Sequence, residues 1–373
     1  MEMQIVYEDF ELKTKNRVLI GNKEQRISLS IRNKDYLYDE KSEFLFSQFG
    51  TMHMVSGLLP EKITLVNYKL EKRVGDFIKR MYKTSGKPFP KIISRRGDIP
   101  GISYLKQEVL PLDDKGVIVP FSSGKDSVYH FLNALKNKQS PHLVHIRNLN
   151  ISCCSEEKKY AEKYAAWKKV RLDMVHLKNG TPRNGFETMK SRDMFLVALM
   201  IPYAFQYGAR NIAIEGFGDE TDFDLFSGQE KYMREFNQLL YALGFLIDIV
   251  WDDKKEWEIL EIMIREYPLD LAHTNSCFSY PLLKDRMQKK IFWSKYPRFP
   301  FYEAQCGGCF KCFIINLARI AFDKKLRCSK KVLGRYVLRA EKWLTEKIRK
   351  KGSHYEDPTF LFVLRLAKEK VGL

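Results

Sequence analysis

The sequence predicts an α/β protein built on a doubly wound, mostly parallel sheet of five strands. Five short apolar segments follow residue 116, helical patterns separate them, and the unit recurs at intervals of roughly 30 residues. The expected strands are 117–121, 143–147, 172–177, 211–215 and 246–251. The expected helices between them are 127–136, 156–169, 187–207 and 230–243. In such a sheet ligands bind at the carboxyl ends of the strands.

Two regions flank this alternation. Residues 1–115 lack it and predict a β-rich accessory domain, in which 91–115 is an extended connection. Strands are expected there at 5–10, 27–38 and 63–68, and helices at 42–58 and 77–82. Residues 256–373 are mainly helical, with helices expected at 256–266, 282–293, 309–322, 331–350 and 358–369. The chain is therefore divided into 1–115, 116–255 and 256–373.

The composition indicates a folded protein with an anionic partner. Of the 373 residues, 45% are hydrophobic and 13% aromatic, which allows a sizeable core. The formal net charge of +18 favours a nucleotide, a nucleic acid, an acidic protein surface or a membrane surface as partner. The sequence has no run of 18 or more apolar residues, so we expect a cytoplasmic protein that does not span a membrane.

The turn after the first strand of the alternation predicts a phosphate site. Residues 116–127 read as a buried strand and a turn, and an amphipathic helix follows, with apolar side chains at Val128, Phe131, Leu132 and Leu135. The turn consists of Ser122, Ser123, Gly124, Lys125, Asp126 and Ser127. Free amides and the positive end of the helix converge there, as they do where α/β proteins hold phosphate.

This turn does not have the Walker A pattern. That pattern requires a glycine where Val119 stands and a Ser or Thr where Asp126 follows Lys125. An ordinary strand-to-helix turn remains the alternative interpretation of the segment.

Four cysteines predict a zinc site. Cys306, Cys309 and Cys312 follow one another at two-residue spacing, and Cys277 is the natural fourth ligand. An iron–sulfur cluster or a redox pair are the alternatives. A closed four-thiolate site has no open coordination position, so its expected role is structural. The adjacent Cys153 and Cys154 are either packed thiols or, near the expected site, a nucleophile.

The segment 324–351 is strongly basic and is either a solvated helix face or a contact for a nucleic acid or an acidic partner. Its cationic residues include Lys324, Lys325, Arg327, Lys330, Lys331, Arg335, Arg339, Lys347, Arg349, Lys350 and Lys351.

The turn resembles the Ser-Gly-Gly-Lys-Asp-Ser signature of the PP-loop ATP pyrophosphatases, with Ser123 in place of the first glycine. Together with Ser276-Cys277 and the Cys306, Cys309 and Cys312 series, it makes the chain similar to the 7-cyano-7-deazaguanine synthase family. Further matches to that family are Ser191-Arg192-Asp193, Gly216, Ser227-Gly228 and Glu235-Phe236. The resemblance covers roughly residues 116–319, so it excludes the first 115 residues and the basic tail.

The chain also departs from that family. The family's Gly-Gln-Arg-His after the second strand is absent from 148–154, and Lys231, Tyr232 and Met233 replace its Asp, Cys and Arg. The insert between Cys277 and Cys306 is longer. An added N-terminal domain and altered substrate loops resemble a divergent branch found in bacterial antiphage operons, whose members attach a deazaguanine acyl group to a protein amine.

The resemblance implies an enzyme that splits ATP into AMP and pyrophosphate. It would adenylate a carboxylate such as 7-carboxy-7-deazaguanine and pass the acyl group to ammonia or a protein amine. A protein from the same operon would be a partner or an acceptor. The implied cofactors are ATP, Mg²⁺ and Zn²⁺.

The resemblance also assigns roles to residues. Ser122, Ser123, Gly124, Lys125 and Ser127 would hold the β and γ phosphates. Asp126 would bind Mg²⁺ or cap the helix, and Arg192 would contact the α-phosphate or the acyl carboxylate. The substrate-binding residues would be Gly216, Asp219, Asp222 and Ser227. For the acids of that loop, ordinary solvated side chains are the alternative.

Two other functions fit the same sequence. One is a PP-loop enzyme that modifies tRNA, which would use the basic tail. The other is a non-catalytic nucleotide-binding subunit of a defence complex, against which the intact 124–127 segment argues.

Overall fold

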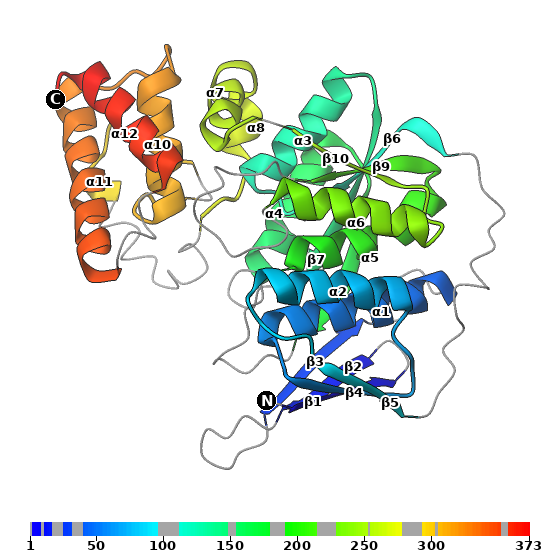
Figure 1. The fold of residues 1–373 in the computed structure, drawn as a ribbon. Helices are drawn as coiled ribbons and strands as arrows, with labels where there is room; N and C mark the ends of the chain where they lie inside the picture. The colour runs from blue at the N-terminus through cyan, green and yellow to red at the C-terminus, as the bar shows by residue number, and fades with distance from the viewer. Residues whose placement is uncertain are drawn as a thin grey trace.

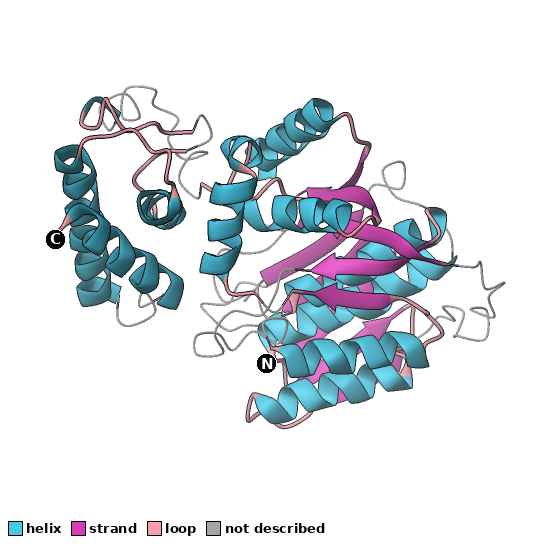
Figure 2. Ribbon diagram, turned by 90° about the horizontal axis from the view of Figure 1, so that it is seen from above, coloured by secondary structure: helices cyan, strands magenta, loops and turns pink. Residues whose placement is uncertain are grey.

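The computed structural model describes residues 2–8, 11–16, 25–31, 40–95, 112–147, 154–179, 191–214, 229–252, 254–277, 293–302, 305–351 and 357–373. Its centre is a mostly parallel sheet with helices on both sides (Figures 1 and 2). The α/β class predicted from the sequence is confirmed. In the described part of the chain, no helix is long and apolar enough to cross a bilayer.

The five expected strands are present and pair in parallel, in the order β10-β9-β6-β7-β8. Their bounds are β6 Asp113–Pro120, β7 Ser140–Arg147, β8 Leu172–Asn179, β9 Ala209–Ile214 and β10 Asp248–Trp251. The helices between them are α3 Lys125–Lys136, α4 Cys154–Lys168, α5 Arg192–Gln206 and α6 Glu230–Ala242. The chain moves outward from β6 to β7 and β8, then returns to β9 on the other side of β6. The ligand crevice of such a sheet lies at this reversal.

The sheet is larger than the five strands expected. β8 pairs antiparallel with β3, and the order continues through β2, β1, β4 and β5 to a total of ten strands. The added strands are β1 Glu2–Glu8, β2 Glu11–Asn16, β3 Gln25–Ile31, β4 Lys62–Val66 and β5 Lys91–Arg95. β5 lies where an extended connection was expected. β2 has no apolar alternation because Leu12 is its one large apolar residue, so its pattern predicted no strand.

The described residues between 2 and 95 share a core with the central sheet. Helices α1 (Glu40–Leu58) and α2 (Lys72–Thr84) lie between the N-terminal strands and helices α5 and α6 (Figure 1). α1 is buried along almost its whole length, and Phe46 packs on Phe195 of α5 with ring centroids 6.1 Å apart. Phe49 and Phe77 both pack on Phe236 of α6. The region predicted as an accessory domain is therefore joined to the rest by strand pairing and by side-chain packing.

Alternation along β6 separates two cores. Ile118 packs with α1, α5 and α6, whereas Val117 and Val119 pack with α3 and the C-terminal helices. Because successive side chains of a strand point to opposite faces, each face of the sheet carries its own helical layer.

The C-terminal helices pack on the α3 side of the sheet. They are α7 Glu256–Glu266, α8 Pro268–Ala272, α10 Phe310–Phe322, α11 Lys330–Lys351 and α12 Pro358–Val371. Tyr336 of α11 is buried against Phe299, Phe301 and Phe313. The helix expected at 282–293 falls, except for its last residue, outside the described residues.

Candidate phosphate loop and metal centre

The turn between β6 and α3 lies at the carboxyl edge of the sheet, beside the chain reversal. Its first residue is fixed to β7, because the Phe121 amide donates to the Val144 carbonyl at 2.8 Å. Gly124 is the N-cap residue of α3, and no side chain of its own caps the helix. The first amides of a helix have no intrahelical acceptor, so this end of α3 presents donors to an anion. Of the six residues predicted for the phosphate site, Ser122, Ser123 and Gly124 lie in this turn, and Lys125, Asp126 and Ser127 form the first turn of α3.

Ser123 adopts a left-handed conformation with φ of 61°. A residue with a Cβ pays about 1 kcal/mol or more in that region, whereas glycine does not. Ser123 is fully buried, and its Oγ has no hydrogen-bond partner among the described residues.

The other serines of the turn hold its shape. Ser122 Oγ accepts from the Gly124 amide at 3.1 Å and lies 3.3 Å from Ser127 Oγ. Ser127 Oγ in turn donates to the Gly124 carbonyl at 3.1 Å. Ser122 is the exposed member of this group.

Lys125 lies inside the protein. Its side chain is 1% exposed, and its Nζ lies 2.5 Å from Asp126 Oδ1 and 2.8 Å from Glu256 Oε1. The same Glu256 oxygen accepts from Lys311 Nζ at 2.9 Å. Burial raises the pKa of Glu256, but the charges of Lys125 and Lys311 outweigh it and hold that pKa well below its ordinary range. The ammonium group therefore connects the turn to α7 and α10.

Sequence reasoning did not identify Glu256 or Lys311. Glu256 begins α7, so the pattern offered only an acidic residue in a first helical turn, which is common. Its contact with Lys125 spans 131 positions of sequence and depends on how α7 packs beside α3.

Arg192 begins α5 on the opposite face of the sheet. Since α3 follows β6 and α5 precedes β9, the N-termini of both helices lie at the carboxyl edge. Arg192 Nε donates to Asp193 Oδ1 at 2.8 Å. The preceding Ser191 contacts the N-terminal region, because its Oγ lies 3.2 Å from His53 Nδ1. Burial, followed by the charge of Arg192, lowers the pKa of His53 to about 3, which keeps this imidazole neutral.

Several predicted residues lie outside the described ones. The substrate-binding residues Gly216, Asp219, Asp222 and Ser227 belong to 215–228, which follows β9. Cys153 is outside the described residues as well. Their assignment therefore stays a prediction.

Four cysteines form a compact cluster, as the sequence predicted. The sulfurs of Cys277, Cys306, Cys309 and Cys312 all lie within 4.8 Å of one another, and all four residues are buried. The pairs Cys277–Cys309 and Cys306–Cys312 are each 3.8 Å apart. Zinc–sulfur bonds of about 2.3 Å in tetrahedral geometry separate the sulfurs by about 3.8 Å, so this set fits a metal such as zinc.

Backbone amides support the cluster. The Cys306 amide donates to Cys277 Sγ and the Gly308 amide to Cys306 Sγ, each at 3.4 Å. Such donors stabilise thiolates around a metal. Gly307 has φ of 75°, which lets the chain curl between Cys306 and Cys309.

The metal centre is attached directly to the turn. The Lys125 amide donates to Ser276 Oγ at 2.9 Å, and the Asn275 amide donates to the Ser123 carbonyl at 2.8 Å. Ser276 precedes Cys277 of the cysteine cluster, so the segment that supplies one of the four thiols also caps α3. Asn275 Oδ1 is buried and has no partner in the described part of the chain. Sequence reasoning matched Ser276 to the family but did not predict this contact.

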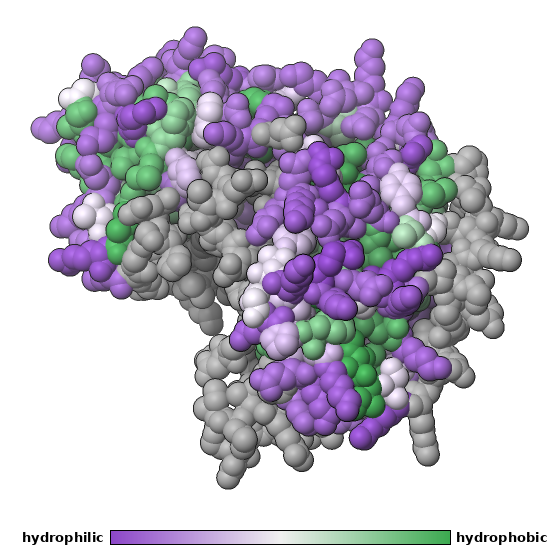
Figure 3. Space-filling view, viewed as in Figure 1, coloured by the Kyte–Doolittle hydropathy of each residue, from purple (hydrophilic) through white to green (hydrophobic). Residues whose placement is uncertain are grey.

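The basic tail presents its charges on the surface. In the segment 324–351, the described cationic residues with exposed side chains are Lys324, Lys325, Arg327, Lys330, Lys331, Arg335, Arg339, Lys342, Arg349 and Lys350. Hydrophilic side chains cover much of the described face in Figure 3, including the outer edge of the C-terminal helices.

No known protein-family model matches this chain, and no curated protein shows significant sequence similarity to it.

Proposed function

We propose that the protein is a PP-loop ATP pyrophosphatase that activates a carboxylate by adenylation and transfers the acyl group to a nitrogen nucleophile. The observation that carries this proposal is the segment 122–127, which joins β6 to the N-terminal end of α3 beside the chain reversal. This placement supports binding of a polyphosphate at that end.

The proposed reaction has two steps. A carboxylate oxygen attacks the α-phosphorus of ATP, so an acyl adenylate forms and pyrophosphate leaves. An amine then attacks the acyl carbon, AMP leaves with the bonding electrons, and the amine loses a proton. The substrate class we propose is a deazapurine carboxylate such as 7-carboxy-7-deazaguanine, and the acceptor is ammonia or a protein amine. We place this activity in 7-deazapurine metabolism or antiphage defence.

The residues of the turn would act on the leaving pyrophosphate. Its growing negative charge is stabilised best by donors that are already oriented, which the first-turn amides of α3 and the hydroxyls of Ser122 and Ser127 provide. The buried hydroxyl of Ser123 is a further donor. Lys125 would offset this charge, and its ion pairs with Asp126 and Glu256 hold it in place. Asp126 would supply a carboxylate oxygen to Mg²⁺ bound with the phosphates. Arg192 would contact the α-phosphate or the carboxylate.

The test is product analysis with purified protein, ATP and 7-carboxy-7-deazaguanine, with and without ammonia or candidate partner proteins. We expect AMP and pyrophosphate in equal amounts and a mass increase on the acyl acceptor. Asp126→Asn should reduce the rate about 100-fold, because it removes a charge at the reacting phosphates. Lys136→Gln, at the exposed end of the same helix, is the control. Formation of ADP, no pyrophosphate under any condition, or an unchanged rate for Asp126→Asn would overturn the proposal.

A second candidate is the same ATP chemistry applied to a tRNA, favoured by the exposed cationic side chains of 324–351. Its test is tRNA binding across a salt series. If several cations contact phosphates, the logarithm of the affinity falls steeply with the logarithm of the salt concentration. Binding that does not change with salt would reject this candidate.

A further inference from the structure

A cavity beside α3 is separate from the phosphate turn. Its volume is ≈ 520 Å³, and it lies between α3, the strands β6, β9 and β10, and the start of α7. Its lining residues are Val117, His130, Asn133, Ala134, Asn137, Gln139, Ala213, Val250, Trp251, Asp252, Lys254 and Glu258. We call this space the α3 cavity. Its size is within the range of sites that bind small molecules.

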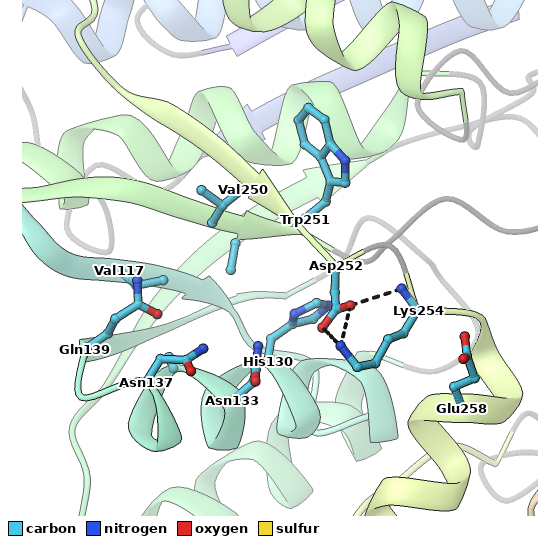
Figure 4. Close-up of a pocket in the computed structure, with 12 residues that line it drawn as sticks. Val117, His130, Asn133, Asn137, Gln139, Val250, Trp251, Asp252, Lys254 and Glu258 are labelled. Atoms are coloured by element: carbon cyan, nitrogen blue, oxygen red, sulfur yellow. Dashed lines mark hydrogen bonds and ion pairs between the residues drawn. The ribbon is translucent and has the colours of Figure 1, made fainter.

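The floor of the α3 cavity is apolar and formed by small side chains. Val117 of β6, Ala213 of β9 and Val250 of β10 all belong to the core on the α3 face of the sheet. Trp251 is adjacent to Val250 in the strand, and its ring points away from the cavity in Figure 4. Small side chains on neighbouring strands make a shallow surface, which suits the face of a flat ring.

One wall carries three side-chain amides and an imidazole. Gln139, Asn137, Asn133 and His130 follow one another along α3 and its end, towards Asp252 (Figure 4). His130, Asn133 and Asn137 are three and four positions apart, so they share one side of the helix. A side-chain amide offers a donor and an acceptor together, as the edges of nitrogen heterocycles require.

His130 is a buried part of the cavity wall. It is 7% exposed, and its Nε2 is buried without a hydrogen-bond partner in the described part of the chain. Burial lowers the pKa of His130 and outweighs the charges of Asp126 and Asp252, which raise it. The ring is therefore neutral near pH 7.

The charges at the carboxyl-edge end of the α3 cavity disfavour an anion. Asp252 accepts from Tyr129 Oη at 2.7 Å and from Lys254 Nζ at 3.0 and 3.1 Å. Glu258 accepts from the Lys255 amide at 2.8 Å. Two carboxylates and one ammonium group line the cavity, so a phosphate or a carboxylate would meet a net negative charge.

We propose that the α3 cavity binds a neutral, planar nitrogen heterocycle of nucleobase size that carries no phosphate. The ring would lie on Val117, Ala213 and Val250, and its edge would bond to the amides of Asn133 and Gln139. This inference does not rest on the proposed ATP chemistry, since neither the turn nor the metal centre contributes to the lining.

The test is isothermal titration calorimetry of the full chain with adenine and with guanine, and with AMP as the phosphate-bearing control. We expect at least one free base to bind, and AMP to bind about tenfold or more weakly at this site. Asn133→Leu keeps the size of the side chain but removes both hydrogen-bonding groups, so affinity should fall about fivefold to tenfold. Gln139→Leu should weaken binding in the same direction.

Lys136→Ala is the matched control, because Lys136 is exposed on the same helix and pairs with Glu266. It should leave the affinity unchanged. Circular dichroism melting of each variant shows whether the fold is retained. No binding of either base at about 1 mM would overturn the proposal. So would unchanged affinity in both leucine variants, or AMP binding that both variants weaken equally.

Discussion

Helix α3 has two regions with opposite electrostatic character. Its N-terminal end carries free amides and the hydroxyls of the 122–127 turn, which favour an anion. Its side towards β10 carries amides, an imidazole and two carboxylates, which favour a neutral ring. One helix thus offers backbone donors at its end and side-chain donors along its length. The two chemistries need not compete.

The two regions also differ in what supports them. The N-terminal end depends on segments far away in sequence, through Ser276, Glu256 and Lys311. The α3 cavity is lined by α3, three strands, the segment after β10 and the start of α7. Perturbing the metal centre should therefore affect the phosphate turn first.

Loss of the metal should have the largest effect. Cys306→Ser removes one thiolate, and structural zinc contributes on the order of 10 kcal/mol in small zinc-binding peptides. We expect zinc content to fall and pyrophosphate release to drop about tenfold or more, because Ser276 and Asn275 would no longer hold the turn. Binding of a nucleobase in the α3 cavity should change less than about threefold.

The control for this experiment is Cys328→Ser. Cys328 is a half-buried free cysteine outside the cluster, so its replacement should change neither zinc content nor rate. A Cys306→Ser protein with full zinc content and full activity would contradict the predicted link between metal centre and turn.

Glu256→Gln should have the second-largest effect. It leaves the buried ammonium groups of Lys125 and Lys311 without their shared carboxylate, which costs about 3–5 kcal/mol in the free energy of unfolding. Urea denaturation measures this loss. Glu261→Gln on the same helix removes only the surface pair with Arg265, so it should cost less than about 1 kcal/mol. Equal losses of unfolding free energy in the two variants would show that the buried ion pairs of Glu256 add nothing to stability.

Acid should destabilise the protein in two pH windows. Buried His53, His130 and His145 have lowered pKa values, so the unfolded chain binds more protons and stability falls as pH drops below 6.5. His53, with a pKa of about 3, accounts for about 2 kcal/mol by pH 5. Glu256 has a depressed pKa, so its contribution is present above 4.5 and is lost as pH falls further.

Two variants can assign the upper pH window to the buried histidines and the lower window to Glu256. Unfolding free energies measured from pH 8 to pH 3 should show that His130→Gln reduces only the upper slope. Glu256→Gln should reduce only the lower slope. The same slopes in wild type and both variants would refute this assignment.

Ser276→Ala should have the smallest effect. It removes the cap of α3 at the Lys125 amide, which costs about 1 kcal/mol. We expect the affinity for ATP to fall about fivefold and nucleobase binding to stay constant. Ser276→Thr keeps the hydroxyl and should restore ATP affinity, measured by calorimetry. Failure of this rescue would indicate that packing, and not the hydroxyl, matters at this position.

The central sheet was predictable because its strands are apolar on both faces. Burial under two helical layers produces continuous apolar segments such as 117–119, which are recognisable without neighbours. β2 and β5 were missed because most of their residues are polar: β2 has one large apolar residue, Leu12, and β5 has two, Ile92 and Ile93. Strands of this kind are identified by their pairing partners, which local pattern does not reveal.

The sequence by itself determined the segment 122–127 with the helix that follows it, and the set of four cysteines that meet in the fold. The segment and three of the cysteines depend on spacing within a few residues, whereas Cys277 lies 29 positions before Cys306. Only the tertiary structure decided that Lys125 is buried against Glu256, that Ser276 caps α3 from 151 positions away, and that His130 faces a cavity. Such contacts arise when separate helices pack on one face of a sheet. Which side chains meet there is set by the packing of whole elements, because no local periodicity encodes it.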